Sequence, residues 1–245
     1  MDYSVDALIR EAKVAIDENV SSDALTREAK VAIDENVSSD ALTALGDLDT
    51  LTLDDIIRSK VEDAAVLVES SAAHHLLTGE QLDTVYADVI AWEDRTEFVG
   101  GCITLPDDFL RLVSFRMSDW YTTVTAPITE ESPEYLMQSS RFGGVRGNPQ
   151  KPVVAIVHRD GQLALEFYSC LNKNASVARA LIVRRPEVFI DKNDNNVEKV
   201  NVCPKLLRAV VYRVASMTAA ITGASDLAAV LLGESNALAG IVTQG

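Results

Sequence analysis

Apolar residues recur at helical spacing in a stretch that begins near Thr52. The apolar positions are Ile57, Val61, Ala64 and Val68. Their 4, 3, 4 spacing places them on one face of an α-helix, which indicates a stripe that faces a core. Thr52 is a residue type that caps helix N-termini. The pattern therefore predicts a helix from Thr52 to about Ala73.

The same periodicity returns near the other end of the chain. Between Pro204 and Gly223 the apolar positions follow 3, 4, 3, 4 spacing at Leu207, Val210, Val214, Met217 and Ile221. Pro fits a first helical turn, and Gly commonly follows a last one. A further helix is predicted from about Ser225 or Asp226, with leucines among alanines.

The middle of the chain, residues 85–183, has a different pattern. It holds short β-branched and aromatic runs: TVYADVIAW, EFVGGCITL, FLRLVSF, VVAIVHR, QLALEFYS and ARALIV. Such runs predict strands. Asp160-Gly161 between two of them predicts a two-residue type I′ hairpin. Ser132-Pro133-Glu134 predicts the first turn of a short helix over EYLMQSS.

Helices at both ends with strands between them predict an α+β fold. We expect a helical bundle from the N- and C-terminal helices with an inserted, mainly antiparallel β-domain. The expected boundaries are 1–45 for an N-terminal helical arm, 46–80 with 200–245 for the bundle, and 81–199 for the β-rich domain.

The N-terminal arm contains an unchanged repeat. Residues 10–26, REAKVAIDENVSSDALT, recur at 27–43. A unit of 17 residues turns a helix through about 1700°, roughly 100° short of whole turns, so one continuous helix would present the copies on different faces. Two units are too few for a solenoid. We interpret the repeat as a tandem duplication, or a slip in the recorded sequence, and expect two short helices peripheral to the fold.

Charge narrows the class of function. The net charge is −15, which argues against a protein that grips DNA, because nucleic-acid affinity comes largely from Lys and Arg. Residues 1–70 hold 17 acids and 6 bases, whereas residues 141–186 hold 8 bases and 2 acids. This asymmetry suits subunits that meet acid to base, although a solvated acidic face explains it equally well.

The cysteines and the hydropathy pattern indicate a soluble, unexported chain. Cys102, Cys170 and Cys203 are odd in number and widely separated, so neither a disulfide framework nor a zinc site follows. The first four residues lack the basic and apolar regions of a secretory signal. No hydrophobic run approaches the roughly 20 residues that span a bilayer.

Residues that could carry chemistry are scattered. His74-His75 follows a predicted helix end and lacks further ligands at metal-binding spacing, and His158 fits a surface position beside a hairpin. Neighbouring acids such as Asp107-Asp108 do not face each other across a cleft. The Gly-rich loop 143–149 lacks the ending of a P-loop. No enzyme, metal or cofactor is expected, and Trp92, Trp120 and Tyr121 are predicted to pack in the core.

Two segments are candidates for contact with a protein partner. Arg141, Phe142 and Arg146 lie in the Gly-rich loop, and Arg and aromatic side chains are enriched at interface hot spots. An exposed loop with no partner is the alternative. After Gly223, a single stripe holds Leu227, Leu231, Leu238 and Ile241, while Gly233 and Gly240 weaken the helix by about 1 kcal/mol each. We expect this segment to dock on a neighbour, the alternative being an ordinary closing helix.

The stretch from Ile103 to Val153 resembles a known structural family. Its step Leu105-Pro106-Asp107-Asp108-Phe109-Leu110-Arg111-Leu112 is similar to the LP-x-DFLRL step of phage head-to-tail connector proteins. With Met117-Ser118-Asp119-Trp120, Arg146-Gly147-Asn148-Pro149 and Lys151-Pro152-Val153, the string resembles the ring or adaptor proteins of crAss-like bacteriophages. With flanking helices, the resemblance covers most of residues 40–222.

The resemblance implies a virion structural protein, a subunit of a dodecameric ring that connects the portal to the tail. The implied partners are other copies of the chain, the portal protein, further tail ring or hub proteins, and DNA that passes without specific binding. The implied location is the virion neck, after assembly in the bacterial cytoplasm. The alternative is a non-enzymatic binding module that presents an Arg-rich loop to a protein partner.

Overall fold

The computed structural model describes residues 2–17, 52–84, 88–90, 99–140, 142, 145–171, 174–192, 194 and 196–241. The chain divides into two compact units, residues 1–77 with 186–245, and residues 78–185. The first unit holds most of the helix and the second most of the strand. The fold is therefore mixed α+β, as the pattern of apolar residues predicts.

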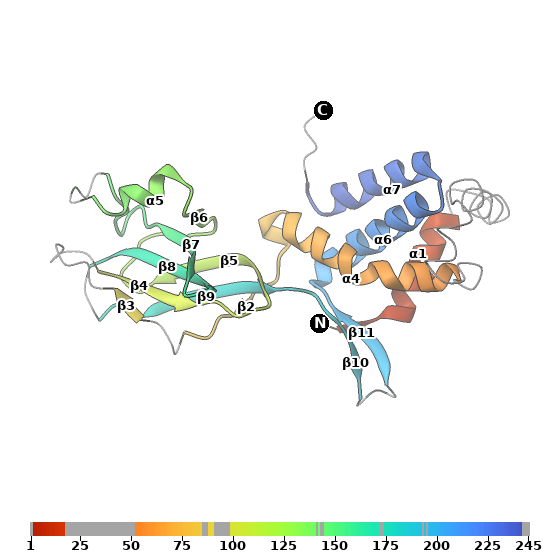
Figure 1. Ribbon diagram of the computed structural model, residues 1–245, viewed down its shortest axis with the longest axis horizontal. Helices are drawn as coiled ribbons and strands as arrows, with labels where there is room; N and C mark the ends of the chain where they lie inside the picture. Colours follow the sequence, from red (N-terminus) through yellow and green to blue (C-terminus); the bar gives the residue numbers. More distant parts are fainter. Residues whose placement is uncertain are drawn as a thin grey trace. The chain divides into compact units, whose positions relative to one another are not determined.

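Four helices build the core of the first unit. They are α1 (Val5–Asp17), α4 (Leu53–Ser71), α6 (Leu207–Ile221) and α7 (Ser225–Leu238). Helix α6 contacts each of the other three (Figure 1). The predicted stripe of α4 is confirmed, because Ile57, Val61, Ala64 and Val68 are all buried. On α6, Val210 and Val214 are buried, but Ile221 at the end of the predicted stripe is 46% exposed.

Local signals set the helix ends. Thr52 and Asp55 form a capping box, in which each side chain accepts a hydrogen bond from the other residue's backbone N–H. The hydroxyl of Thr52 also donates to the Asp55 carboxylate, and this bond, together with the one from Thr52 N–H, lowers the pKa of Asp55. A short 3₁₀ turn, η3 (Pro204–Leu206), precedes α6. Gly223, at φ 85°, ends α6 as predicted.

The two C-terminal helix ends share one backbone motif. After α6, Ala224 N donates to Ala219 O and Gly223 N donates to Ala220 O. After α7, Ile241 N donates to Asn236 O and Gly240 N to Ala237 O. These paired bonds form a Schellman motif with glycine in the left-handed conformation. Gly240 therefore terminates α7 rather than weakening its interior, which corrects the expectation for this residue.

A three-stranded antiparallel sheet completes the first unit. Its order is β1 (Asp2–Ser4), β11 (Val197–Asn201) and β10 (Val188–Asp191). None of these strands was expected from the pattern. Figure 1 shows β10 and β11 as a hairpin. Residues 186–199 thus cluster with the helices, whereas the sequence boundaries place them with the β-rich domain.

Helix α1 belongs to the core, so the expectation of a peripheral N-terminal arm is wrong for the described residues 2–17. Its buried side chains are Val5, Leu8, Ile9, Ala12, Ala15 and Ile16. They face α4 and α6. The rest of the first copy, residues 18–26, and the whole second copy, residues 27–43, lie outside the described residues. The expectation failed because the phase of the repeat cannot reveal a groove built by helices far away in sequence.

The second unit contains two sheets. One has the strand order β2 (Glu80–Gln81), β9 (Val177–Arg184) and β5 (Phe109–Met117). The other has the order β3 (Asp88–Ile90), β4 (Val99–Thr104), β8 (Gln162–Cys170), β7 (Val154–Arg159) and β6 (Ile128–Thr129). Pairing is antiparallel except between β6 and β7. Phe115 and Ile182 of the first sheet share one buried cluster with Ile103 and Phe167 of the second.

Two local predictions in this unit are confirmed. Asp160 and Gly161 both have positive φ, 51° and 83°, as a type I′ turn between β7 and β8 requires. The short helix α5 (Pro133–Met137) begins after Ser132. Ser132 does not cap α5 with its side chain, because its Oγ instead accepts a hydrogen bond from Thr129 N.

Candidate functional site

The polar turn in the LPDDFLRL step is held by an ion pair. Asp108, between β4 and β5, accepts two hydrogen bonds of 2.8 Å from Nη1 of Arg184 at the end of β9. Arg184 Nε also lies 3.2 Å from a carboxylate oxygen of Glu80. These acids keep the pKa of Arg184 raised above its usual value. Asp108 thus has a structural role, fixing the start of β5 against β9.

In the described part of the loop that follows α5, an aromatic side chain is exposed and an arginine is buried. Phe142 is 75% exposed, but Arg146 is only 8% exposed. The expectation that Arg146 lies on an exposed loop is therefore wrong. Arg141 lies outside the described residues.

Backbone hydrogen bonds explain why Arg146 turns inward. The carbonyl oxygen of Phe142 accepts hydrogen bonds from the N–H groups of Val145 and Arg146. Gly147 N donates to Oε1 of Gln138 at 3.0 Å. A Cβ on Gly147 would lie 2.5 Å from the Oγ of Ser169, so only glycine fits this approach. The backbone at Gly147 therefore packs closely against Ser169 of β8, and the neighbouring Arg146 is buried.

Four apolar residues of α5 and of the loop that follows it are exposed, and together we call them the α5 patch: Leu136, Met137, Phe142 and Val145. Their exposed fractions are 75%, 44%, 75% and 50% respectively. Tyr135 of α5 is half-buried, and Gln138, the residue that follows the helix, is buried. Sequence reasoning found only Phe142. The available signal was the length of EYLMQSS, because a one-turn helix cannot bury apolar residues on all sides.

The C-terminal helix is mainly an element of the intrachain core. Leu231 is fully buried, and Ser235 Oγ donates to Ala209 O of α6 at 2.8 Å. In return Ser216 Oγ of α6 donates to Ala228 O. Leu231 is therefore unavailable to a partner, which corrects the expectation for this residue.

The other residues of the predicted stripe differ in exposure. Leu227 and Ile241 are half-buried, and Leu238 is 37% exposed. Val230, which the stripe did not include, is 56% exposed. The buried line of α7 runs through Ala228, Leu231, Ser235 and Ala239 instead. The alternative, an ordinary closing helix, describes most of α7.

Beneath α5 lies a polar cluster that the sequence did not reveal. Glu166 of β8 is fully buried and pairs with Arg159 of β7. It also accepts hydrogen bonds from the hydroxyl groups of Tyr168 and Tyr135. Burial and the neighbouring carboxylate raise the pKa of both tyrosines. Because these groups satisfy one another, we read the cluster as the attachment of α5 to the sheet.

The described residues hold no group of three or more His, Cys, Asp or Glu side chains that could bind a metal ion. His158 is exposed, as expected for a surface position. Trp120 is 1% exposed and packs edge-on against Phe115, which confirms it as a core residue. Tyr121 is 73% exposed, so its predicted place in the core is wrong. Trp92 lies outside the described residues.

The three cysteines are free thiols. Cys170 is buried, and this burial raises its pKa to about 12. The thiol therefore stays protonated at neutral pH and is a poor nucleophile. Its neutral form contributes stability below pH 9.0, the ordinary pKa, and this contribution is lost as pH rises toward about 12.

Comparisons with known proteins do not identify the chain: no family model matches it, and no curated protein matches it. Among the described residues, no helix combines the length and apolar character needed to cross a membrane.

Proposed function

We propose that this chain is a structural subunit of a bacteriophage virion, one copy in a ring that connects the portal to the tail. The observation that carries the proposal is the α5 patch, Leu136, Met137, Phe142 and Val145. A cluster of exposed apolar side chains on a protein surface commonly marks a protein–protein contact. It lies inside the stretch 103–153, whose sequence resembles connector proteins.

In this proposal the N- and C-terminal helices form a bundle. The β-domain, residues 78–185, is inserted in the sequence between these helices. Identical subunits pack side by side, so a patch on one copy meets a different surface on the next and the ring closes. The resemblance to connector proteins implies a dodecamer that follows the portal's symmetry. The net charge of −15 suits a channel through which DNA passes without adhering.

A double variant of the α5 patch tests this function. Leu136→Ser with Phe142→Ser removes the two most exposed side chains of the patch, each 75% exposed. We expect the melting temperature to stay nearly unchanged, because exposed residues add little to folding. We expect the variant to form no ring with the portal. Light scattering and electron microscopy of the mixture detect the ring.

Leu171→Ser provides the matched control. Leu171 is 50% exposed in the same unit but lies outside the patch. This variant is expected to assemble normally. Normal assembly by the patch variant as well would contradict the proposal.

The second candidate function is a binding module that presents this loop to a protein partner outside a ring. The burial of Arg146 leaves the loop fewer arginines to display, so such a partner would contact Phe142 and its apolar neighbours. Mixing the protein with its portal distinguishes the two functions. A ring appears only under the first, and the protein stays monomeric beside the portal under the second.

A further inference from the structure

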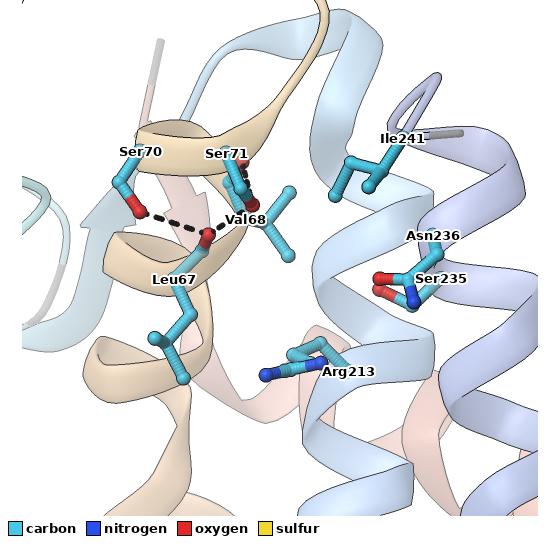
Figure 2. A pocket seen from close by; sticks show the side chains of 8 residues that line it. All are labelled: Leu67, Val68, Ser70, Ser71, Arg213, Ser235, Asn236 and Ile241. Carbon is cyan, nitrogen blue, oxygen red and sulfur yellow. Dashed lines mark hydrogen bonds between the residues drawn. The ribbon is translucent and has the colours of Figure 1, made fainter. Parts of the chain in front are cut away.

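A cavity opens among the helices of the first unit, beside the last turn of α4. Its volume is about 270 Å³. The described residues that line it are Leu67, Val68, Ser70 and Ser71 of α4, Arg213 of α6, and Ser235, Asn236 and Ile241 of the C-terminal segment (Figure 2). Its walls are mostly apolar, and none of these lining residues is acidic.

Arg213 brings a positive charge into this cavity. Figure 2 shows its side chain extending from α6 toward Leu67 of α4. Its Nε atom is buried and makes no hydrogen bond to any described residue. A buried donor without an acceptor costs free energy, more so when it is charged. The cavity therefore contains a cationic donor that an external acceptor would satisfy.

The neighbouring polar groups make hydrogen bonds to other residues, and none of these bonds goes to Arg213 Nε. Leu67 O already accepts hydrogen bonds from Ser70 Oγ and Ser71 Oγ. Val68 O accepts one from Ala72 N at 2.8 Å. The hydroxyl of Ser235 donates to Ala209 O. The hydroxyl protons are thus committed, and Arg213 is the cationic group that a ligand would meet.

We infer that this cavity binds a carboxylate group carried on a short aliphatic chain. A carboxylate accepts two hydrogen bonds from a guanidinium in matching geometry, which makes it the natural partner of Arg213. Leu67, Val68 and Ile241 would contact the aliphatic part. A cavity of about 150 Å³ holds one benzene ring, so a volume of about 270 Å³ admits roughly ten non-hydrogen atoms.

Two sources could supply this group. One is a free small carboxylate. The other is a Glu or Asp side chain of a second copy, since the chain carries 37 acids against 22 bases. In the second case the site would help to hold subunits together, but its carboxylate chemistry does not depend on ring formation.

Hexanoate is a suitable probe, with hexylamine and hexanol as controls that share its alkyl chain. We expect hexanoate to raise the melting temperature of the full chain at matched ionic strength, and the other two compounds to have little effect. NMR or titration calorimetry then gives the affinity. Arg213→Gln is expected to weaken hexanoate binding by about 10- to 100-fold, the scale of a charge-assisted hydrogen bond, and Arg213→Lys by less.

Arg208→Gln is the matched control variant. Arg208 lies on the same helix but is exposed, with its guanidinium stacked 5.8 Å from the ring of Tyr212. It is expected to bind hexanoate as the unchanged protein does. Equal binding by hexylamine, unchanged affinity in Arg213→Gln, or no hexanoate binding at all would overturn the inference.

Self-association distinguishes the two sources. If hexanoate binds and also disperses oligomers in sedimentation, and Arg213→Gln disperses them without it, the carboxylate comes from a second copy. If hexanoate binds and oligomers persist, the site takes a free carboxylate. A failure of the ring proposal alone would leave hexanoate binding to the monomer intact.

Discussion

Two residues distinguish α1 from the otherwise identical stretch seventeen residues later. Residues 5–17 read VDALIREAKVAID and residues 22–34 read SDALTREAKVAID. The differing positions are Val5 and Ile9, replaced by Ser22 and Thr26 in the later stretch. Val5 is fully buried and Ile9 is 4% exposed. Burial of these apolar side chains therefore favours the first stretch for the groove beside α4 and α6.

Replacing both residues by their later counterparts tests this assignment. Val5→Ser with Ile9→Thr removes buried methyl groups and buries two hydroxyls, so unfolding should become easier by about 2–5 kcal/mol. Denaturant melts measure this loss. Val14→Thr on the same helix is the control, because Val14 is 54% exposed. A loss below about 1 kcal/mol in the double variant would show that α1 adds little to the core.

At the scale of elements, α7 has one glycine in its interior, Gly233, and another just after its end, Gly240. Gly240 has a φ of 67°, and a Cβ there would lie 2.8 Å from the Cβ of Ala73. Ala73 N also donates to Ala239 O at 2.8 Å, which ties the end of α7 to the end of α4. Gly233 lies inside the helix, and a Cβ there would meet nothing within 4 Å. Only Gly240 is required by the fold.

Alanine at these two positions should have opposite effects. Gly233→Ala is expected to stabilise the protein by about 0.5–1 kcal/mol, because alanine loses less backbone entropy in a helix. Gly240→Ala is expected to destabilise it by about 1–3 kcal/mol, since a left-handed conformation and a close contact both oppose a Cβ. Thermal melts of the two variants decide the question. A stabilised Gly240→Ala would argue against the packing of Ala73 on α7.

At the scale of the whole molecule, the duplicated unit has an unusual consequence. Deleting residues 10–26 joins Ile9 to Arg27, and residues 27–34 repeat the sequence of residues 10–17. The shortened chain therefore keeps the complete sequence of α1. Deleting residues 27–43 gives the identical protein. What changes is the length of the connection between α1 and α4.

The deletion of one unit should leave stability nearly unchanged. It halves the 34 residues between Asp17 and Thr52, and halving a connection changes its closure cost by only about 0.6 kcal/mol. We expect the free energy of unfolding to shift by less than about 1 kcal/mol in denaturant melts. A loss of several kcal/mol would indicate that the second copy contributes packing of its own.

The sequence by itself determined the local features of the fold, such as helix caps, helix ends and tight turns. The α4 stripe, its Thr52 cap, the Gly223 stop and the Asp160-Gly161 turn depend on residues within a few positions of one another. Side-chain periodicity and the backbone preferences of Gly, Pro and Thr decide such features before any long-range contact forms. The six β-runs of the middle region and the α+β class followed from the same signals.

Only the tertiary structure decided which side chains are buried and which stay exposed for contact with a partner. Arg146 is buried because Gly147 packs against Ser169, and Leu231 is buried because α6 covers it. Glu166 sits in the interior because Arg159, Tyr135 and Tyr168 surround it. The packing of α1 on α6 and the cavity between Leu67 and Arg213 join residues more than a hundred positions apart. No local pattern encodes these contacts, because burial depends on which distant surfaces meet and on the free energy gained when they exclude water.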